Sequence, residues 1–213
     1  MKKAVYLLCA LVSFLVFVGC KTDPKGFDLV EYVVSLENND EYTGYTQTIN
    51  SESTQYTKIM QYDRGKGIYK YVYETKKLNP FGSEEQYSIV REEEYYANNR
   101  RYFFEDEAWN SEEYKYSSGS MQYSFKREYF QDSFELPNSS ASEAKFEGKL
   151  RDDKVDDFFG EDVNAQNVNI AVTFNAKTKR LLSIEITYQT PSNDTVTIIT
   201  TISYQYVDLN LPE

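Results

Sequence analysis

The side chains that most often do chemistry in proteins are scarce in this sequence. Histidine is absent from the 213 residues, and cysteine occurs only twice, at Cys9 and Cys20. The absence of histidine excludes Ser-His-Asp and Cys-His catalysis and histidine metal ligation. The sequence also contains no glycine-rich nucleotide-binding motif and no G-x-S-x-G motif. No catalytic residue and no cofactor is therefore predicted.

The sequence that precedes Cys20 suggests a function for this cysteine. Lys2 and Lys3 precede an almost wholly apolar run, residues 4–18, and Gly19 is the small residue just before Cys20. A positive start, a short apolar core and a small residue at its end are typical of an export signal. The run is too short for a membrane-spanning helix, which needs about 17–25 residues.

The end of this segment, Phe17-Val18-Gly19-Cys20, resembles the lipobox of bacterial lipoproteins, with Phe17 at the position where that family usually has leucine. The resemblance implies that cleavage falls between Gly19 and Cys20 and that Cys20 carries a diacylglycerol. Two acyl chains are enough for stable attachment to a membrane. The expected location is therefore the extracytoplasmic face of a bacterial cell membrane. The alternative is an uncleaved anchor or a buried free cysteine.

The charge of the exported chain limits its partners. Without residues 1–19 the chain keeps 34 acidic and 21 basic residues, a net charge of −13. Nucleic acid and anionic lipid head groups repel such a chain, so nucleic acid is not an expected partner and the acyl anchor on Cys20 must hold the protein at the membrane. Cys20 would be the sole remaining cysteine, so no internal disulfide is expected.

Acidic clusters are the remaining places where chemistry could occur. They are Glu92–Glu94, Glu105–Glu107 and the acids within residues 152–157. None of them has the Asp-x-Asp-x-Asp-Gly spacing of a calcium loop. A sequence alone cannot place two carboxylates at the separation that a glycosidase needs. We interpret the clusters as solvated surface, with a metal site or a catalytic pair as alternatives, and predict no metal site.

The elements that position these residues are mostly strands. Residues 20–26 read as a tether, and helical spacing of apolar residues begins at Phe27. In residues 168–174, 182–188 and 196–206, apolar and polar residues alternate. A period of two predicts an antiparallel sheet with one face against a core. Further strands are expected at 42–49, 56–62, 68–74, 86–97, 100–105 and 145–151, and short helical segments at 121–130 and 153–159.

The C-terminal pattern VTFNAKTKRLLSIEITYQ, followed by TVTIITTISYQYVDLNLP, resembles the lipoprotein-carrier superfamily of LolA- and LppX-like proteins. The resemblance implies a curved half-barrel that is plugged by helices and holds an acyl chain or another apolar ligand in its concavity. We therefore expect residues 27–213 to form a single α+β domain. In it, a curved, half-barrel-like antiparallel meander is covered by an N-terminal helix and short helical inserts.

Residues on one face of the last strands are the expected ligand-binding residues. They are Ile186, Tyr188, Ile198, Ile202 and Tyr204. Their alternative role is plain core packing. Tyr69, Tyr71 and Tyr73, which share a strand face, suggest either an aromatic ligand strip or cross-strand packing.

The expected function is non-enzymatic binding or carriage of an apolar or amphipathic ligand at the membrane. A surface interaction or adhesion module with a solid core is the alternative, and a carboxylate-based enzyme is the third possibility. A concavity of about 300 Å3 or more that is lined by the apolar stripes of residues 168–174, 182–188 and 196–206 would favour carriage, since ligand pockets have at least that size. A filled core with an exposed aromatic patch would favour a partner surface.

Overall fold

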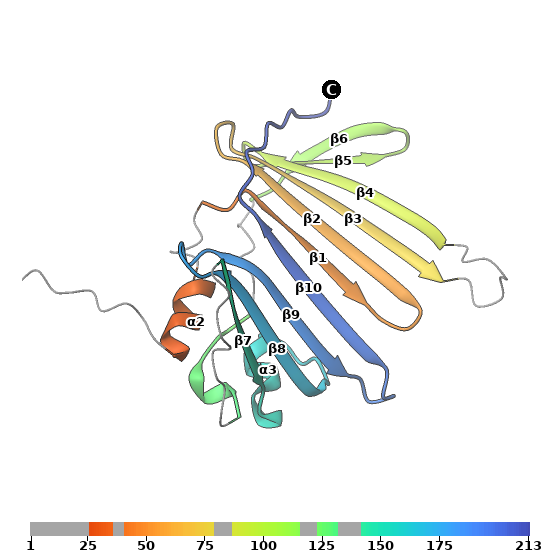
Figure 1. Ribbon diagram of the computed structural model, residues 1–213. Helices are drawn as coiled ribbons and strands as arrows, with labels where there is room; N and C mark the ends of the chain where they lie inside the picture. Colours follow the sequence, from red (N-terminus) through yellow and green to blue (C-terminus); the bar gives the residue numbers. More distant parts are fainter. Residues whose placement is uncertain (1–25, 36–40, 79–86, 116–122, 132–141) are drawn as a thin grey trace, which may run out of the picture.

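The computed structural model describes residues 26–35, 41–78, 87–115, 123–131 and 142–213, and most of these residues belong to one antiparallel sheet (Figure 1). The expected signal segment and Cys20 lie outside the described residues. The spatial order of the ten strands is β6-β5-β4-β3-β2-β1-β10-β9-β8-β7. The expected curved antiparallel sheet is therefore present, and it is open.

The strands fall into two groups along the chain. The first group is β1 (Gly44–Asn50), β2 (Thr54–Asp63), β3 (Ile68–Leu78), β4 (Tyr87–Ala97), β5 (Arg100–Glu105) and β6 (Ala108–Glu113). The second group is β7 (Glu143–Lys149), β8 (Gln166–Asn175), β9 (Leu181–Gln189) and β10 (Thr195–Ser203). Each group is a meander, because its strands pair in sequence order.

The two meanders join where β1 pairs with β10. Tyr45 lies opposite Ile202 and Ile49 opposite Ile198, in an antiparallel register that runs the whole length of β1. The expected single meander is therefore two meanders that are joined through the first and last strands. Local alternation of residues does not predict this pairing, because the strands lie about 150 residues apart in the sequence.

In two of the hairpin turns, two consecutive residues have positive φ. Asn98 and Asn99 have φ of 52° and 58° and connect β4 to β5, as the Asn-Asn pair predicts. Asp106 and Glu107, with φ of 53° and 62°, make the same kind of turn between β5 and β6. Asp-Glu is a weak turn signal, so β6 was not expected.

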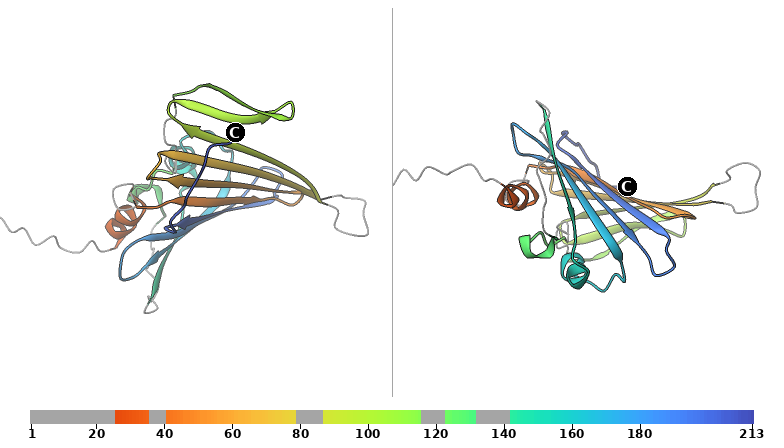
Figure 2. Two further views of the ribbon diagram at one scale, coloured as in Figure 1. Left: turned by 90° about the horizontal axis from the view of Figure 1, so that it is seen from above. Right: turned by 60° about the horizontal axis from the view of Figure 1, so that its bottom comes forward.

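Helices are short and gather at one end of the sheet (Figure 2). They are α2 (Phe27–Val34), α3 (Val155–Phe159) and two single turns of 3-10 helix, η1 (Arg127–Tyr129) and η2 (Asp152–Lys154). Helix α3 ends at Gly160, whose φ of 74° is left-handed and whose N–H donates to the carbonyl of Asp156 at 2.8 Å. The end of α3 agrees with the short helical segment expected at 153–159, and a left-handed glycine commonly follows the end of a helix. None of the helices among the described residues is long and apolar enough to cross a membrane.

The main core lies between these helices and strands β7 to β10. Phe27 of α2, Phe130 and Phe146 of β7 pack with ring centroids 5.1–5.7 Å apart. Phe158 of α3 and Ile186 of β9 are fully buried in the same cluster. The helical cover is thus smaller than expected: it packs on the second meander and on the edge of β1 that adjoins it.

A bulge changes the register of β9. The pairing with β8 shifts between Thr173 and Phe174, so that Phe174 lies opposite Leu181. Leu181 is fully buried, whereas Leu182 is partly exposed. The expectation that Leu182 begins the buried stripe is therefore wrong, because the sequence pattern assumes an uninterrupted period of two.

The C-terminal segment after β10 returns to the β2–β3 turn (Figure 1). The buried carboxylate of Asp63 accepts the N–H of Leu209 at 3.1 Å and the N–H of Lys66 at 3.1 Å. The ammonium of Lys66 in turn donates to Asp208 at 2.6 Å and to the carbonyl of Leu209 at 2.7 Å. Asp63 therefore fastens the tail to the sheet.

Acid should loosen this attachment. The N–H of Leu209 is the main reason why the pKa of Asp63 is lower than its ordinary value of 3.8. A lowered folded-state pKa stabilises the protein above pH 3.8, and that contribution is lost as the pH falls below it. We expect Asp63→Asn to lower the melting temperature at pH 7 and to weaken its fall between about pH 4 and pH 2. Thermal unfolding monitored by circular dichroism measures both, and an unchanged melting temperature would contradict the role of Asp63.

Two neighbouring positions of β10 test which face is the core. Ile202 is buried and Thr201 is exposed on the opposite face. Ile202→Ala should lower the free energy of unfolding by about 2–5 kcal/mol, because a buried side chain is replaced by a cavity. Ile202→Glu should prevent folding, whereas Thr201→Glu should change stability little. Urea denaturation measures the series, and equal losses at the two positions would refute the assigned face.

Candidate functional site

The face of the sheet that carries the core continues beyond the helices. Side chains of directly paired residues in neighbouring antiparallel strands lie on the same side of a sheet. The registers therefore extend the face of Ile202 across β1 to β5, and we call this side the inner face. Outside the helical cover it includes Tyr45, Gln47, Tyr56, Lys58, Met60, Tyr62, Tyr69, Tyr71, Tyr73, Thr75, Val90, Glu92, Glu94, Tyr96, Arg101 and Phe103.

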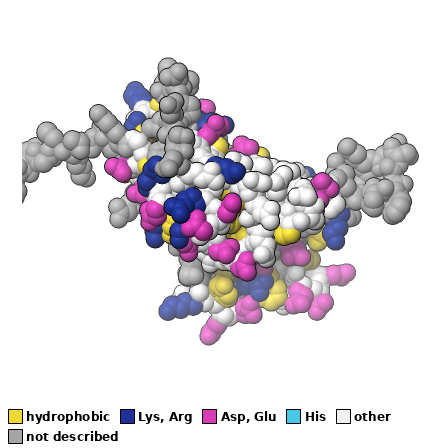
Figure 3. Space-filling view, turned by 90° about the horizontal axis from the view of Figure 1, so that it is seen from below, with side chains coloured by type: hydrophobic (Ala, Val, Ile, Leu, Met, Phe, Trp, Pro, Cys, Tyr) yellow, Lys and Arg dark blue, Asp and Glu magenta, His cyan; other side chains and the backbone are white. Residues whose placement is uncertain are grey.

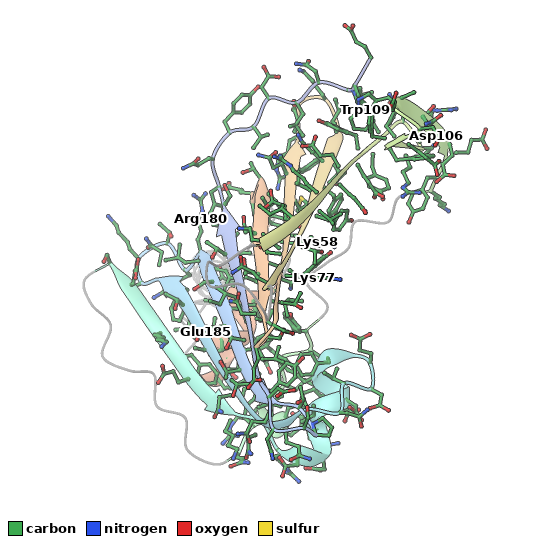
Figure 4. All side chains as sticks on the ribbon, turned by 90° about the vertical axis from the view of Figure 1, so that its right-hand side faces the viewer. Lys58, Lys77, Asp106, Trp109, Arg180 and Glu185 are labelled. Carbon is green, nitrogen blue, oxygen red and sulfur yellow. The ribbon has the colours of Figure 1, made fainter. Side chains whose placement is uncertain are left out.

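Tyrosines surround one lysine on this face. We call Tyr45, Tyr56, Tyr71, Tyr73 and Tyr96 the tyrosine cluster. The ammonium of Lys58 on β2 lies 5.0 Å from the ring centroid of Tyr71, 5.8 Å from that of Tyr73 and 6.0 Å from that of Tyr45. These separations are in the range of cation–π attraction. Figure 4 shows Lys58 between the β5–β6 hairpin, which carries Trp109, and the helical end of the sheet.

The rings of the cluster are held by one another. Tyr71 and Tyr73 are nearly parallel, with centroids 6.1 Å apart and planes 10° apart, and Tyr56 stacks on Tyr73 at 6.5 Å. Tyr71 meets Tyr96 edge-on at 5.6 Å. Both Tyr71 and Tyr96 are buried, so this part of the cluster is rigid and the tyrosines make cross-strand contacts.

Lys58 is half-buried, and its environment disfavours the charge. Burial lowers the pKa of Lys58 from 10.5, and the negative charge of Glu94 opposes this effect only in part. No ion pair joins Lys58 to a carboxylate among the described residues. The ring faces replace only part of the hydration that the ammonium loses, so an anion placed here would find a preformed cationic partner.

Glu94 is committed to other partners. It accepts the hydroxyl of Tyr96 at 2.6 Å and is also paired with Arg101, which reaches Glu112 on β6 at 2.9 Å. Burial and the bond to Glu94 raise the pKa of Tyr96, and the two carboxylates raise the pKa of Arg101. The network therefore ties β4, β5 and β6 together, with Glu94 as a structural acceptor.

The acidic clusters of the sequence are divided by the pleat of the sheet. Glu93 lies on the outer face, where it pairs with Lys70 at 3.0 Å and with Arg91 at 2.9 Å, whereas Glu92 and Glu94 lie on the inner face. Near α3, Asp153 pairs with Arg151 and Asp157 with Lys154. Across the described residues no three acidic or cysteine side chains converge as a metal site. Acidic and basic side chains are likewise interspersed on the face in Figure 3.

A cleft opens beside the tyrosine cluster, between β4 and the β5–β6 hairpin. It has a volume of about 610 Å3, and its lining includes Glu92, Glu94, Arg101, Phe103 and Trp109. A volume of this size is in the range of ligand sites. The lining mixes charged and aromatic side chains, so the cleft is not an apolar pocket.

The five predicted ligand residues do share one face, as the period of two requires. Ile186, Ile198 and Ile202 belong to the buried core, and Tyr188 and Tyr204 are half-buried beside it. Tyr188 packs edge-on against Phe159 at 6.1 Å. The hydroxyl of Tyr204 donates to the carbonyl of Leu181 at 3.0 Å. Their part in ligand binding stays a prediction.

A polar boundary separates this core from the tyrosine cluster. The amide of Gln47 donates to the hydroxyl of Tyr123 at 3.2 Å and to Thr200 at 3.3 Å. Burial is the main cause that raises the pKa of Tyr123 to about 12, and the bond from Gln47 opposes it. The three side chains satisfy one another where the apolar core ends.

Lys58 was not singled out from the sequence. The available signal was a lysine flanked at two-residue spacing by Tyr56 and Met60, on a strand that pairs with the Tyr71–Tyr73 face. Period two places these side chains together once the hairpin register is known.

Comparison with solved structures finds LprF from Mycobacterium bovis, with a TM-score of 0.44 and 10% sequence identity over 88% of this chain and 95% of that chain. The hypothetical protein CT021 from Chlamydia trachomatis overlaps with a TM-score of 0.32 and 11% identity over 80% and 92%. No family model matches the sequence, and no curated protein matches it. These overlaps are too loose to assign a family, so the resemblance to lipoprotein carriers stays a prediction.

Proposed function

We propose that the protein is a lipid-anchored lipoprotein of the extracytoplasmic membrane face that binds an anionic amphiphile, without catalysis, on the inner face beside Lys58. The observation that carries this proposal is the half-buried ammonium of Lys58, which is surrounded by tyrosine rings and has no carboxylate partner among the described residues. A carboxylate or phosphate head group would complete this site electrostatically.

The tyrosine cluster suits the rest of such a ligand. Tyrosine rings offer apolar surface, and their hydroxyls offer hydrogen bonds at the rim, so they accept a molecule with one polar and one apolar end. The face also continues to the cleft beside Glu94 and Phe103, which gives an extended ligand further room. Ring packing within the cluster means that little ordering is needed on binding, which favours affinity.

Binding of a ligand is compatible with a filled core because the proposed site lies outside that core. Ile186, Ile198 and Ile202 are packed beneath helices, so an uncovered binding surface is available only farther along the inner face. The proposed ligand therefore lies on the first meander, while the second meander supplies stability. The anchor on Cys20 and the location at the membrane rest on the lipobox resemblance, and the acidic charge requires such an anchor.

Neutralising Lys58 tests the proposed head-group site. With a form of the chain that begins at Gly26, a fluorescent C16 fatty acid should bind about tenfold more weakly to Lys58→Gln than to the parent protein, since a charge-assisted contact is lost. Lys177→Gln, in the exposed β8–β9 turn, is the matched control and should leave the affinity unchanged. Fluorescence titration measures the dissociation constants.

The same assay includes outcomes that would contradict the proposed head-group site. The uncharged methyl ester of the probe should bind the parent and Lys58→Gln equally, and weaker than the acid binds the parent. Affinity for the acid should also fall as the pH rises toward 10.5, because Lys58 loses its proton below that value. Equal binding of acid and ester to the parent would refute an anionic head group at Lys58.

The anchor is tested at Cys20. Cys20→Ser should leave a precursor that is neither acylated nor cut by the lipoprotein peptidase, because the thiol that accepts the lipid is gone. Metabolic labelling with a fatty-acid probe, followed by mass measurement, reports both changes. Fatty-acid label that persists on the Cys20→Ser protein would contradict the proposed anchor.

A further inference from the structure

Strand β4 has an edge that no described strand covers. Residues Tyr87–Tyr96 pair with β3 along the whole strand, but β5 pairs only with residues Glu94–Ala97. Residues 87–93 therefore have one neighbour strand among the described residues, and their other edge is open. The length of uncovered edge, seven residues, is a typical length for an added strand.

This edge of β4 is uncovered because the β5–β6 hairpin is short. β5 has six residues and turns back at Asp106 and Glu107, whereas β4 has eleven. Pairing stops at Phe103 opposite Glu94, and beyond this pair the hairpin splays away from β4 (Figure 1). The cleft of about 610 Å3 is the wedge that the splay leaves, and Trp109 is one of its lining residues.

Apolar side chains are exposed around this wedge. Ile89 is 61% exposed and Val90 56% exposed on β4, and Phe104 is 58% exposed on β5. An uncovered strand edge with exposed apolar residues would be an aggregation hazard unless a partner occupies it or charge protects it. Alternation along β4 places Ile89 and Val90 on opposite faces, so an added strand would be held on both sides.

The charge around the wedge is negative after its internal pairs are removed. Arg91 pairs with Glu93 at 2.9 Å and approaches Glu74 at 3.8 Å, and Arg101 pairs with Glu94 and Glu112. Glu92 and Glu105 also line the wedge, both are exposed, and neither is ion-paired among the described residues. A continuation of the β4–β5 register would set these two carboxylates opposite each other, on either side of an inserted strand.

We infer that the open edge of β4 receives an extended segment of a partner protein, with alternating basic and apolar residues, as an additional strand. Main-chain hydrogen bonds to residues 87–93 supply affinity, as in other strand additions. Glu92 and Glu105 on the inner face select basic side chains, and Ile89 and Phe104 on the opposite face receive apolar ones. A second copy of this chain is disfavoured, because a molecule with a formal charge of −11 repels its own kind at an acidic edge.

Fluorescence anisotropy tests this inference with the full-length chain in an uncharged detergent. The probe is a labelled ten-residue peptide of alternating lysine and valine. Glu92→Gln combined with Glu105→Gln should weaken its binding about fivefold, since two exposed charge contacts are removed. The matched control, Glu52→Gln combined with Glu161→Gln, removes the same charge at exposed sites elsewhere and should leave the affinity unchanged.

Two comparisons separate strand addition from simple charge attraction. The same peptide with N-methyl groups on alternate residues keeps its charge but cannot pair, so it should bind about tenfold more weakly. Peptide binding should slow amide hydrogen exchange in residues 89–93. Equal binding of the N-methylated peptide, protection elsewhere, equal losses in both double variants, or self-association without peptide would each overturn the inference. None of these results depends on Lys58, so they are distinguishable from a failure of the amphiphile site.

Discussion

The pairing of β1 with β10 is the constraint on which the other features depend. It joins the two meanders and sets Tyr45 beside Ile202, so that the covered core and the tyrosine cluster lie on one continuous face. The seam is tight: Gly44 pairs with both Ser203 and Gln61, and a Cβ there would lie 2.3 Å from the carbonyl oxygen of Met60. Backbone cannot give way as a flexible side chain can, so glycine is required at this position.

The inner face is divided into a part covered by helices and an uncovered part because the two meanders carry different side chains. Helices of eight and five residues are too short to be stable alone, so they exist only where strands offer an apolar surface. Strands β8 to β10 present Val172, Ile184 and Ile198, which provide such a surface. Strands β2 to β4 present tyrosine, lysine and glutamate instead, and their rings pack mainly on one another. The half with the covered core and the half with the tyrosine cluster are therefore different parts of one sheet.

The sequence predicted those features that depend on neighbours along the chain. The alternation in β8 to β10, the Asn98-Asn99 turn and the stop at Gly160 are all local, and all are present. Three features were not predicted, each for a physical reason. The β1–β10 pairing is non-local, the bulge at Leu182 breaks the period of two, and β6 follows a turn of weak signature. The site around Lys58 needs the register of β2 with β3, which alternation alone does not fix.

The basic side chains in the uncovered half of the sheet differ in whether they have a carboxylate partner. Among the basic side chains of β3 to β5, Lys70, Arg91 and Arg101 each have a carboxylate partner. Lys58 lies on the inner face of the neighbouring strand β2 beside tyrosine rings, and Glu94, the acid that acts on it electrostatically, is already bonded to Arg101 and Tyr96. Charge that a fold leaves uncompensated at a half-buried position costs stability. The tyrosine rings offset part of that cost, and the anion proposed above would offset more of it, which a purely structural role for Lys58 would not.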